Sequence, residues 1–271
     1  MKKQTIKFNI PANLHLSALV RNFSEELFCA VGFNKAWCSR LKLVVDELFM
    51  NAVRYGSKVD ESMVYVSCDY DDEIIKFSIA DEGVGSKKIT AKDLKTLVHN
   101  NEKNQTLTQT SGRGLAMITS LWTDELNIEE SEHGGILVTF NKKIESSSTP
   151  PHPPLIQMSL DNIKDEVSFD DIVVDGPIVN VDLHGPIDNY EVDDIVAPVY
   201  ASLKNIADAS TLSINLKEIN YINSIFIGHL ASWYNEINKK QGHIILKNTS
   251  PQVKDILDIV GLGSVIKIEN K

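Results

Sequence analysis

The chain has 271 residues, of which 42% are hydrophobic and 24% charged, which suits a globular protein of one large or two ordinary domains. Its net charge of −10 and its lack of a basic stripe argue against nucleic-acid binding by charge. No apolar run approaches the ~20 residues of a membrane span, and no apolar core follows the basic N-terminus as in a secretory signal. We expect a cytoplasmic protein that contacts neither nucleic acid nor membrane.

The charge is spread unevenly along the chain. Residues 1–145 hold 18 Lys and Arg against 20 Asp and Glu, whereas residues 146–271 hold 9 against 17. An acidic second half would favour a basic protein partner, although a plain solvated surface has the same composition.

The three cysteines, Cys29, Cys38 and Cys68, form an odd set without C-x-x-C spacing. This pattern is typical of small buried side chains in a reducing cytoplasm. We therefore expect neither a disulfide framework nor a zinc site.

Hydrophobic periodicity predicts the elements of the first half. Two long amphipathic helices are expected at about residues 14–30 and 35–55, each preceded by an Asn that can serve as its cap. Alternating apolar residues, bounded by turn residues, predict strands at 6–10, 63–68, 74–79, 124–130 and 135–142.

The second helix carries two polar residues, Glu47 and Asn51, at a spacing of four, which places them on one helix face. A carboxylate and a carboxamide stacked in this way offer oxygen ligands to a hard cation and a base beside it. An amphipathic helix that exposes a polar stripe would show the same spacing.

A strand ends at Asp81-Glu82-Gly83-Val84-Gly85. A buried carboxylate at Asp81 can accept a hydrogen bond from an exocyclic amine of a purine, and the glycines let the backbone approach a flat ring. A simple turn would look similar.

Residues 86–110 show no strong period, which is typical of a disordered segment or a functional lid. The turn Ser111–Gly114 then opens an apolar helix, a geometry that suits a phosphate.

Residues 145–154 hold four of the nine prolines and predict a linker of polyproline character. We place the first domain at 1–144, the linker at 145–160 and the second domain at 161–271. Strands alternate with helices after the linker, which implies crossover connections and a sheet with helices on it. The expected elements are strands at 177–184, 211–216 and 243–247, and helices ending near 207, at 224–239 and at 251–260.

The order E-x-x-x-N, D-x-G-x-G, lid and G-x-G-L resembles the GHKL ATP-binding fold, and within it the anti-sigma-factor serine kinases, over residues 5–143. The resemblance implies a Bergerat-type α/β sandwich in which a mixed sheet carries helices on one face. By that likeness Asn51 would hold Mg²⁺ at the phosphates of ATP, Glu47 would be the general base, and Asp81 would bind adenine. Further residues would make room for the ring or close on the phosphates: Gly83, Gly85, Ser111, Gly112, Arg113 and Gly114.

Residues 176–268 resemble the STAS domains of anti-anti-sigma factors, another α/β fold. In that family the serine at a helix start, within Asp-Ser-(Ser/Thr)-Gly, is the phosphoacceptor, and Ser224 aligns with it. Asn223 stands where the family has Asp, and Phe226 where it has Gly. Ser224 is therefore either a phosphoacceptor or only the N-cap of the helix.

Together the two resemblances imply a partner-switching regulator. An ATP- and Mg²⁺-dependent kinase would phosphorylate a serine of a STAS domain, its own or that of a separate protein, and so control a sigma factor. An intramolecular contact between kinase and STAS domain and a homodimer are both compatible with this. The alternative is a non-catalytic module that holds ATP or a partner as a switch and never modifies Ser224. An ATPase of the gyrase or mismatch-repair kind fits poorly, because their transducer domains are absent.

Overall fold

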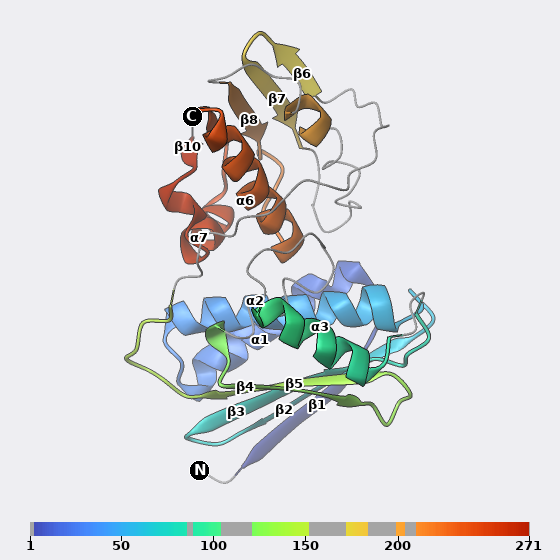
Figure 1. The fold of residues 1–271 in the computed structure, drawn as a ribbon. Coiled ribbons are helices and arrows are strands. Elements are labelled where there is room, and N and C mark those ends of the chain that lie inside the picture. The colour runs from blue at the N-terminus through green and yellow to red at the C-terminus, as the bar shows by residue number, and fades with distance from the viewer. Residues whose placement is uncertain are drawn as a thin grey trace. The chain divides into compact units, whose positions relative to one another are not determined.

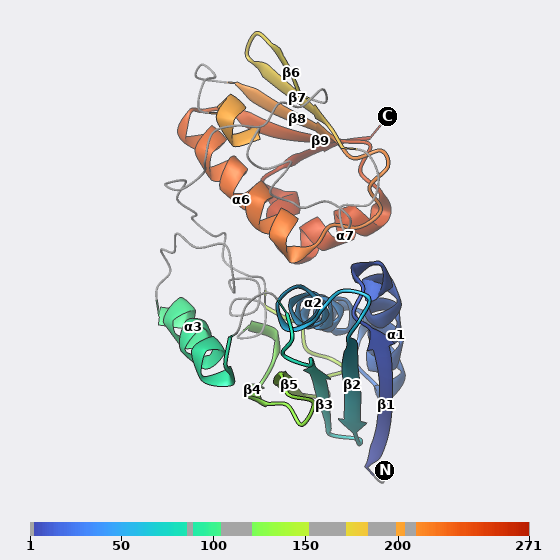
Figure 2. The same cartoon turned by 90° about the vertical axis from the view of Figure 1, so that its right-hand side faces the viewer.

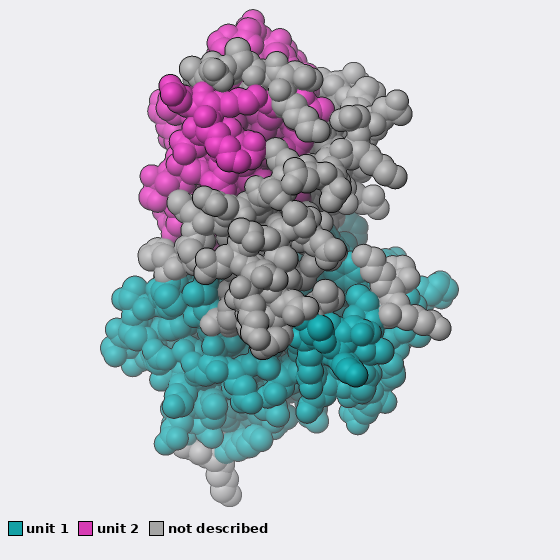
Figure 3. Space-filling view, viewed as in Figure 1, with its two compact units in different colours: residues 1–104, 111–151 teal, residues 105–110, 152–271 magenta. Residues whose placement is uncertain are grey.

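A computed structural model describes residues 3–85, 89–103, 121–151, 172–183, 199–203 and 210–270. The chain divides into two compact units, coloured separately in Figure 3. The first contains the described residues up to Pro151, and the second those from Ile172 onward. Among the described residues, no helix is long and apolar enough to cross a membrane.

The first unit is built on a five-stranded sheet with the order β1-β2-β3-β5-β4. All four strand pairings are antiparallel, so the expected mixed sheet was wrong in its strand directions. The reason is topological: β2–β3 and β4–β5 are hairpins, and β5 rather than β4 lies beside β3. The strands are β1 (Gln4–Pro11), β2 (Met63–Tyr70), β3 (Ile74–Ala80), β4 (Glu125–Glu130) and β5 (Ile136–Lys143).

Helices α1 (Ser17–Val31) and α2 (Lys35–Asn51) cover one face of this sheet (Figures 1 and 2), as expected. A short 3-10 turn, η1 (Leu14–Leu16), precedes α1. Gly32 ends α1 in the left-handed region, with φ of 113°, a conformation that glycine adopts without strain. The fully buried ring of Phe28 packs against rings of β3 and β5, which joins the helix layer to the sheet.

The cysteine prediction was wrong for two of the three residues. Cys29 of α1 and Cys38 of α2 are joined as a disulfide, with their Cα atoms 5.8 Å apart. The tight turn between the helices brings together two residues that stand only nine apart in sequence. Cys68 is a buried free thiol, and burial, with a contribution from Asp69, raises its pKa to about 12.

One helix appears where the sequence predicted no regular structure, α3 (Ala91–Lys103). It begins with a reciprocal cap in which Asp93 accepts hydrogen bonds from the backbone and hydroxyl of Thr90, and Thr90 Oγ1 accepts one from the Asp93 backbone. The T-x-x-D spacing was the available signal for this helix. Residues 104–120, which follow, lie outside the described part of the chain.

The start of the Pro-rich segment folds against the first unit. Asn34 caps α2 through its Oδ1 and donates its Nδ2 to the carbonyls of Ser146 and Ser148 at 3.2 and 2.9 Å. The indole of Trp37 donates to Ser148 Oγ at 2.8 Å, and the indole of Trp122 donates to the Pro151 carbonyl at 3.0 Å. These bonds tie residues 146–151 to helix α2 and to Trp122.

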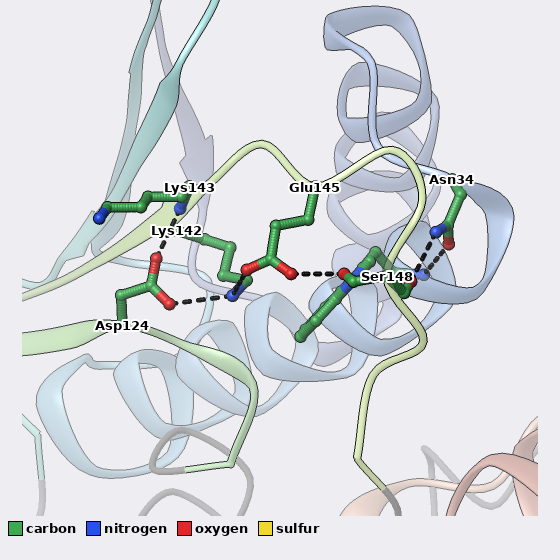
Figure 4. A network of polar contacts seen from close by, with 7 residues as sticks. Asn34, Asp124, Lys142, Lys143, Glu145 and Ser148 are labelled. Carbon is green, nitrogen blue, oxygen red and sulfur yellow. Dashed lines mark hydrogen bonds and ion pairs between the residues drawn. The ribbon is translucent and has the colours of Figure 1, made fainter.

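Lys142 is the charged centre of this contact (Figure 4). Its ammonium lies 2.9 Å from Asp124 and 2.8 Å from Glu145, and 4.3 Å from the centre of the Trp37 ring. Burial alone would lower the pKa of Lys142, but its hydrogen bonds to Glu145 and Asp124 outweigh burial and raise it. The same bond from Lys142, with one from Ser148, lowers the pKa of Glu145.

Replacing Lys142 with methionine should therefore destabilise the first unit by about 1 kcal/mol, because it removes the cation that pairs with Asp124 and Glu145, whose side chains are 37% and 36% exposed and stay hydrated. The matched control is Lys143→Met, since the exposed neighbour contributes only its backbone N–H to Asp124. Urea unfolding of both variants at pH 7 measures the difference. Equal midpoints for the two variants would contradict the assigned role of Lys142.

The second unit is built on a five-stranded mixed sheet with the order β10-β9-β8-β7-β6. β6 pairs antiparallel with β7, and the remaining pairs are parallel, as expected for strands joined by helical crossovers. β6 and β10 were not predicted. The strands are β6 (Ile172–Asp175), β7 (Ile178–Asp182), β8 (Thr211–Asn215), β9 (His243–Lys247) and β10 (Lys267–Glu269).

Helices α6 (Ser224–Lys239) and α7 (Pro251–Ile259) lie on the same face of this second sheet (Figure 2). Asn223 caps α6 and Ser250 caps α7. The alternative that Ser224 is the N-cap of α6 was wrong by one residue, because Ser224 is the first residue of the helix itself. Residues 199–203 are also helical, within the segment predicted to form a helix up to about 207.

Candidate functional site

Glu47 and Asn51 lie in the last two turns of α2, and their side chains are in contact. Asn51 Nδ2 donates to Glu47 Oε1 at 2.9 Å, as their spacing of four residues allows. Glu47 is 6% exposed, whereas Asn51 is half-buried. The hydrogen bond commits the amide nitrogen of Asn51 to Glu47, so its carbonyl oxygen is the atom that can bind a cation or another donor.

The neighbouring carboxylate, Asp46, has a different role. It lies 2.8 Å from Arg21 of α1, and both side chains are buried. This ion pair joins α1 to α2 and neutralises Asp46 within the helix layer. Of the two adjacent carboxylates, Asp46 therefore serves the packing of the helices and Glu47 belongs to the Asn51 pair.

Directly after Asn51 the helix widens into a π-helical turn, η2 (Ala52–Gly56). Such turns interrupt the regular hydrogen-bond ladder and occur often at functional sites. Gly56, at its end, packs against the carboxylate of Asp81: a Cβ on Gly56 would lie 2.0 Å from Asp81 Cγ. Five residues of chain therefore connect the Glu47–Asn51 pair with Asp81.

Asp81 follows β3 and is held by backbone groups. Its Oδ1 accepts from the N–H of Gly83 at 2.9 Å and from the N–H of Ile136 at 3.2 Å. Burial raises the pKa of this carboxyl group, although the two hydrogen bonds oppose the shift. Both of these bonds go to Oδ1, so Oδ2 is the oxygen that remains for a further donor.

Glycines line both sides of the Asp81 carboxylate. A Cβ on Gly135, in the turn between β4 and β5, would lie 1.9 Å from Asp81 Oδ1, closer than any real contact. Gly83 has φ of 65° and lies against the backbone of the same turn, where a Cβ would meet the Gly134 carbonyl at 2.6 Å. A Cβ on Gly85 would meet the Tyr55 carbonyl of η2 at 2.2 Å. The carboxylate of Asp81 is thus surrounded closely by the backbone of Gly56, Gly83 and Gly135, which we call the Asp81 socket.

The structure brings together Glu47 with Asn51, and Asp81 with Gly83, as the sequence predicted. Gly56, Gly135 and the N–H of Ile136 were missed, because only the fold places η2 and the β4–β5 turn against Asp81. The two adjacent glycines, Gly134 and Gly135, were the available signal. Ser111, Gly112, Arg113 and Gly114 lie outside the described residues.

In the second unit, α6 begins at Ser224, and the preceding residue, Asn223, is its N-cap. Asn223 is fully buried, and its Oδ1 accepts from the Phe226 backbone at 2.9 Å. Phe226 is also fully buried, with its ring 6.0 Å from that of Trp233. The phenyl group therefore packs into the core and adds no bulk to the surface at the helix start.

Comparison with known proteins gives each unit a family. Residues 10–142 match the family model of the histidine kinase-like ATPase domain, and residues 171–271 match that of the STAS domain.

Among solved structures, the chain is similar to the unphosphorylated anti-sigma factor antagonist SpoIIAA, with 23% identity over 36% of this chain and 84% of that one, at a TM-score of 0.32. A putative anti-sigma factor antagonist from Thermotoga maritima has 17% identity over 37% and 84% of the two chains, at a TM-score of 0.30. Phosphorylated SpoIIAA from Bacillus has 22% identity over 36% and 86%, at a TM-score of 0.31. On the two family matches, the chain consists of a histidine kinase-like ATPase domain of the GHKL type followed by a STAS domain.

Proposed function

We propose that the chain is a cytoplasmic partner-switching regulator whose first domain is an ATP- and Mg²⁺-dependent protein serine kinase. This domain would phosphorylate a serine of a STAS domain, its own or that of a separate protein, and so control the availability of a sigma factor. ATP binding itself follows from the family of the first domain. The observation that carries the kinase proposal is the Glu47–Asn51 hydrogen bond, one turn before the segment that packs on Asp81. It joins a buried carboxylate to a carboxamide that could bind a cation, near a carboxylate that could accept a purine amine, and this supports the proposal.

In this proposal Asp81 Oδ2 accepts the exocyclic amine of adenine, while the fixed Oδ1 keeps the carboxylate in place. Guanine presents a carbonyl at that position and would face the carboxylate with an acceptor. Gly56 and Gly135 pack closely against the carboxylate and help to hold it in place. The site would therefore select ATP over GTP.

The donor set fits Mg²⁺, because Asn51 offers a carbonyl oxygen and the ion takes few protein ligands beside phosphate oxygens and water. Bound Mg²⁺ would neutralise charge on the phosphates. Glu47 would accept the proton of the serine hydroxyl. The serine oxygen would form the new bond to the γ-phosphorus as the bond from that phosphorus to ADP breaks. The Glu47–Asn51 hydrogen bond would hold the base and the cation ligand at a fixed distance from each other.

The STAS domain supplies the expected substrate. A serine at the first position of α6 has a helix N-terminus beside it, where phosphate is favoured, and the added charge of roughly −2 would change a docking surface. An unphosphorylated STAS domain, the chain's own or a separate protein's, would compete with a sigma factor for the kinase. A flexible tether gives an effective concentration of the order of millimolar where geometry permits contact, so a weak intrinsic affinity would suffice.

The test uses γ-labelled ATP with Mg²⁺ on four samples: wild type, Glu47→Ala, Ser224→Ala, and wild type mixed with a size-tagged Glu47→Ala chain. We expect label on the wild-type STAS domain and none on Glu47→Ala alone. Label on the tagged chain in the mixture indicates transfer between molecules, and its absence there indicates transfer within one.

Label that survives in Ser224→Ala would assign another acceptor and overturn only the choice of Ser224. Measurable ATP binding without label on any STAS substrate would favour the non-catalytic alternative, in which bound ATP acts as a conformational switch. The neutral Asn223 beside Ser224, where the STAS family has Asp, is the feature that favours this alternative.

A further inference from the structure

The cap of α6 carries a hydrogen-bond donor that the fold does not use. Asn223 is 0% exposed, and its Oδ1 is committed to the Phe226 N–H. Because Nδ2 is bonded to the same carbon as Oδ1, this bond also places the amide nitrogen at the first turn of α6. In the described part of the chain, no acceptor pairs with Nδ2. Leaving a donor buried and unpaired is unfavourable, so a ligand that paired with it would be favoured.

The backbone at this helix start also favours an anion. α6 has 16 residues and no acidic residue in its first turn. The Phe226 N–H is capped by Asn223 Oδ1, and the Ile227 N–H donates to the Asn223 carbonyl at 3.0 Å. The N–H groups of the first two helical residues, 224 and 225, have no partner within the helix. The positive end of the helix dipole and the unpaired amide of Asn223 thus point to the same class of ligand.

We propose that the start of α6 is a cradle for a phosphoryl group, in which Asn223 Nδ2 donates to the phosphate carried by Ser224 after phosphorylation. The origin of that phosphate rests on the proposed kinase function, whereas the cradle itself rests on Asn223 and the helix end. A phosphorylated serine carries about −1.5 to −2 charges. A carboxylate at position 223 would repel it, but the carboxamide supplies a donor and no charge. Asn223 is therefore a positioning residue that stabilises the phosphorylated state of the switch.

The test needs no kinase, because phosphoserine can be incorporated at position 224 of the full chain during translation. The three chains to compare carry Asn223, Asn223→Ser and Asn223→Asp. Serine keeps a capping oxygen but lacks the amide, and aspartate keeps the cap but adds a charge. Each chain is unfolded thermally with Ser224 phosphorylated and unphosphorylated.

With Asn223, phosphorylation should raise the unfolding midpoint of the STAS domain by about 4 °C or more. The gain should shrink in Asn223→Ser, and phosphorylation should lower the midpoint in Asn223→Asp. A second readout is the side-chain NH₂ resonance of Asn223 in asparagine-labelled protein, assigned with Asn223→Ser. We expect it to move downfield on phosphorylation, and this measurement remains decisive if a variant fails to fold.

An Asn223 amide resonance that is the same with and without phosphate at Ser224 overturns the cradle. So does an equal change of midpoint in all three chains. Failure of the labelled-ATP experiment leaves this test intact, because translation supplies the phosphoserine. Conversely, label on Ser224 together with an unchanged Asn223 amide resonance would support the kinase function and contradict the proposed phosphate cradle.

Discussion

The Glu47→Gln variant should bind ATP as wild type does but transfer phosphate about 10²- to 10⁴-fold more slowly, the range that general bases contribute. Glutamine retains an oxygen that can accept the hydrogen bond from Asn51 Nδ2, now 2.9 Å from Glu47 Oε1. It cannot accept the proton of a serine hydroxyl. Single-turnover transfer to a STAS domain, with ATP affinity measured in parallel, separates the loss of the base from a loss of binding.

Asp46→Asn is the matched control, because it removes a carboxylate from the adjacent residue of the same helix. Asp46 is paired with Arg21 at 2.8 Å, so its loss should destabilise the domain by about 3–5 kcal/mol. At a temperature where the variant remains folded, its transfer rate should stay within a few-fold of wild type. If Asp46→Asn loses transfer as severely as Glu47→Gln, the assignment of the base to Glu47 is wrong.

The Asp81→Asn variant should lose about 10- to 100-fold in ATP affinity while its nucleotide-free form becomes more stable at pH 7. The lost affinity follows from replacing an acceptor of the adenine amine with a donor. The gained stability follows from burial, which raises the pKa of Asp81 and so penalises the ionised carboxylate in the folded state. Calorimetry with ATP and thermal unfolding without it measure the two effects.

The pH dependence of the stability gain has a definite sign. A carboxyl group whose folded pKa is raised contributes stability that is fully present below its ordinary pKa of 3.8 and is lost as pH rises through the folded pKa. The difference between Asp81→Asn and wild type should therefore be present at pH 7 and vanish on acidification below 3.8.

Asp69→Asn provides the control of opposite sign. The hydrogen bond from Thr5 lowers the pKa of Asp69, so ionisation of Asp69 stabilises the fold. This variant should be slightly less stable than wild type at pH 7 and bind ATP normally. If Asp81→Asn keeps full ATP affinity, the assignment of Asp81 to the nucleotide site is wrong.

Local patterns predicted most of the elements but not the contacts between them. The helical spacing of Glu47 and Asn51 and the start of α6 near Ser224 are properties of single helices and could be predicted from the sequence, although the cap of α6 is Asn223. The socket of Asp81 depends on Gly56 and Gly135, which stand 25 residues before and 54 residues after it, and no local pattern reports such packing.

Other features were missed because two local sequence signals in the same segment indicated different structures. The polar segment at 86–110 contains the T-x-x-D cap of α3, but its low hydrophobicity predicted a loop. The prolines at 150–154 predicted a linker from residue 145, whereas Asn34 and Trp37 hold Ser148 against α2. The disulfide between Cys29 and Cys38 depends on the angle at which the helices pack, which residue spacing does not determine.

The claim on which most depends is that a nucleotide bound by the first domain delivers its γ-phosphate to a STAS serine. Tandem mass spectrometry of the full chain, after incubation with ATP and Mg²⁺, measures this directly. We expect a phosphate on a STAS-domain serine, with Ser224 as the assigned position, in wild type and not in Glu47→Gln. A chain that binds ATP yet carries no phosphate, and transfers none to a separate STAS domain, would contradict the claim.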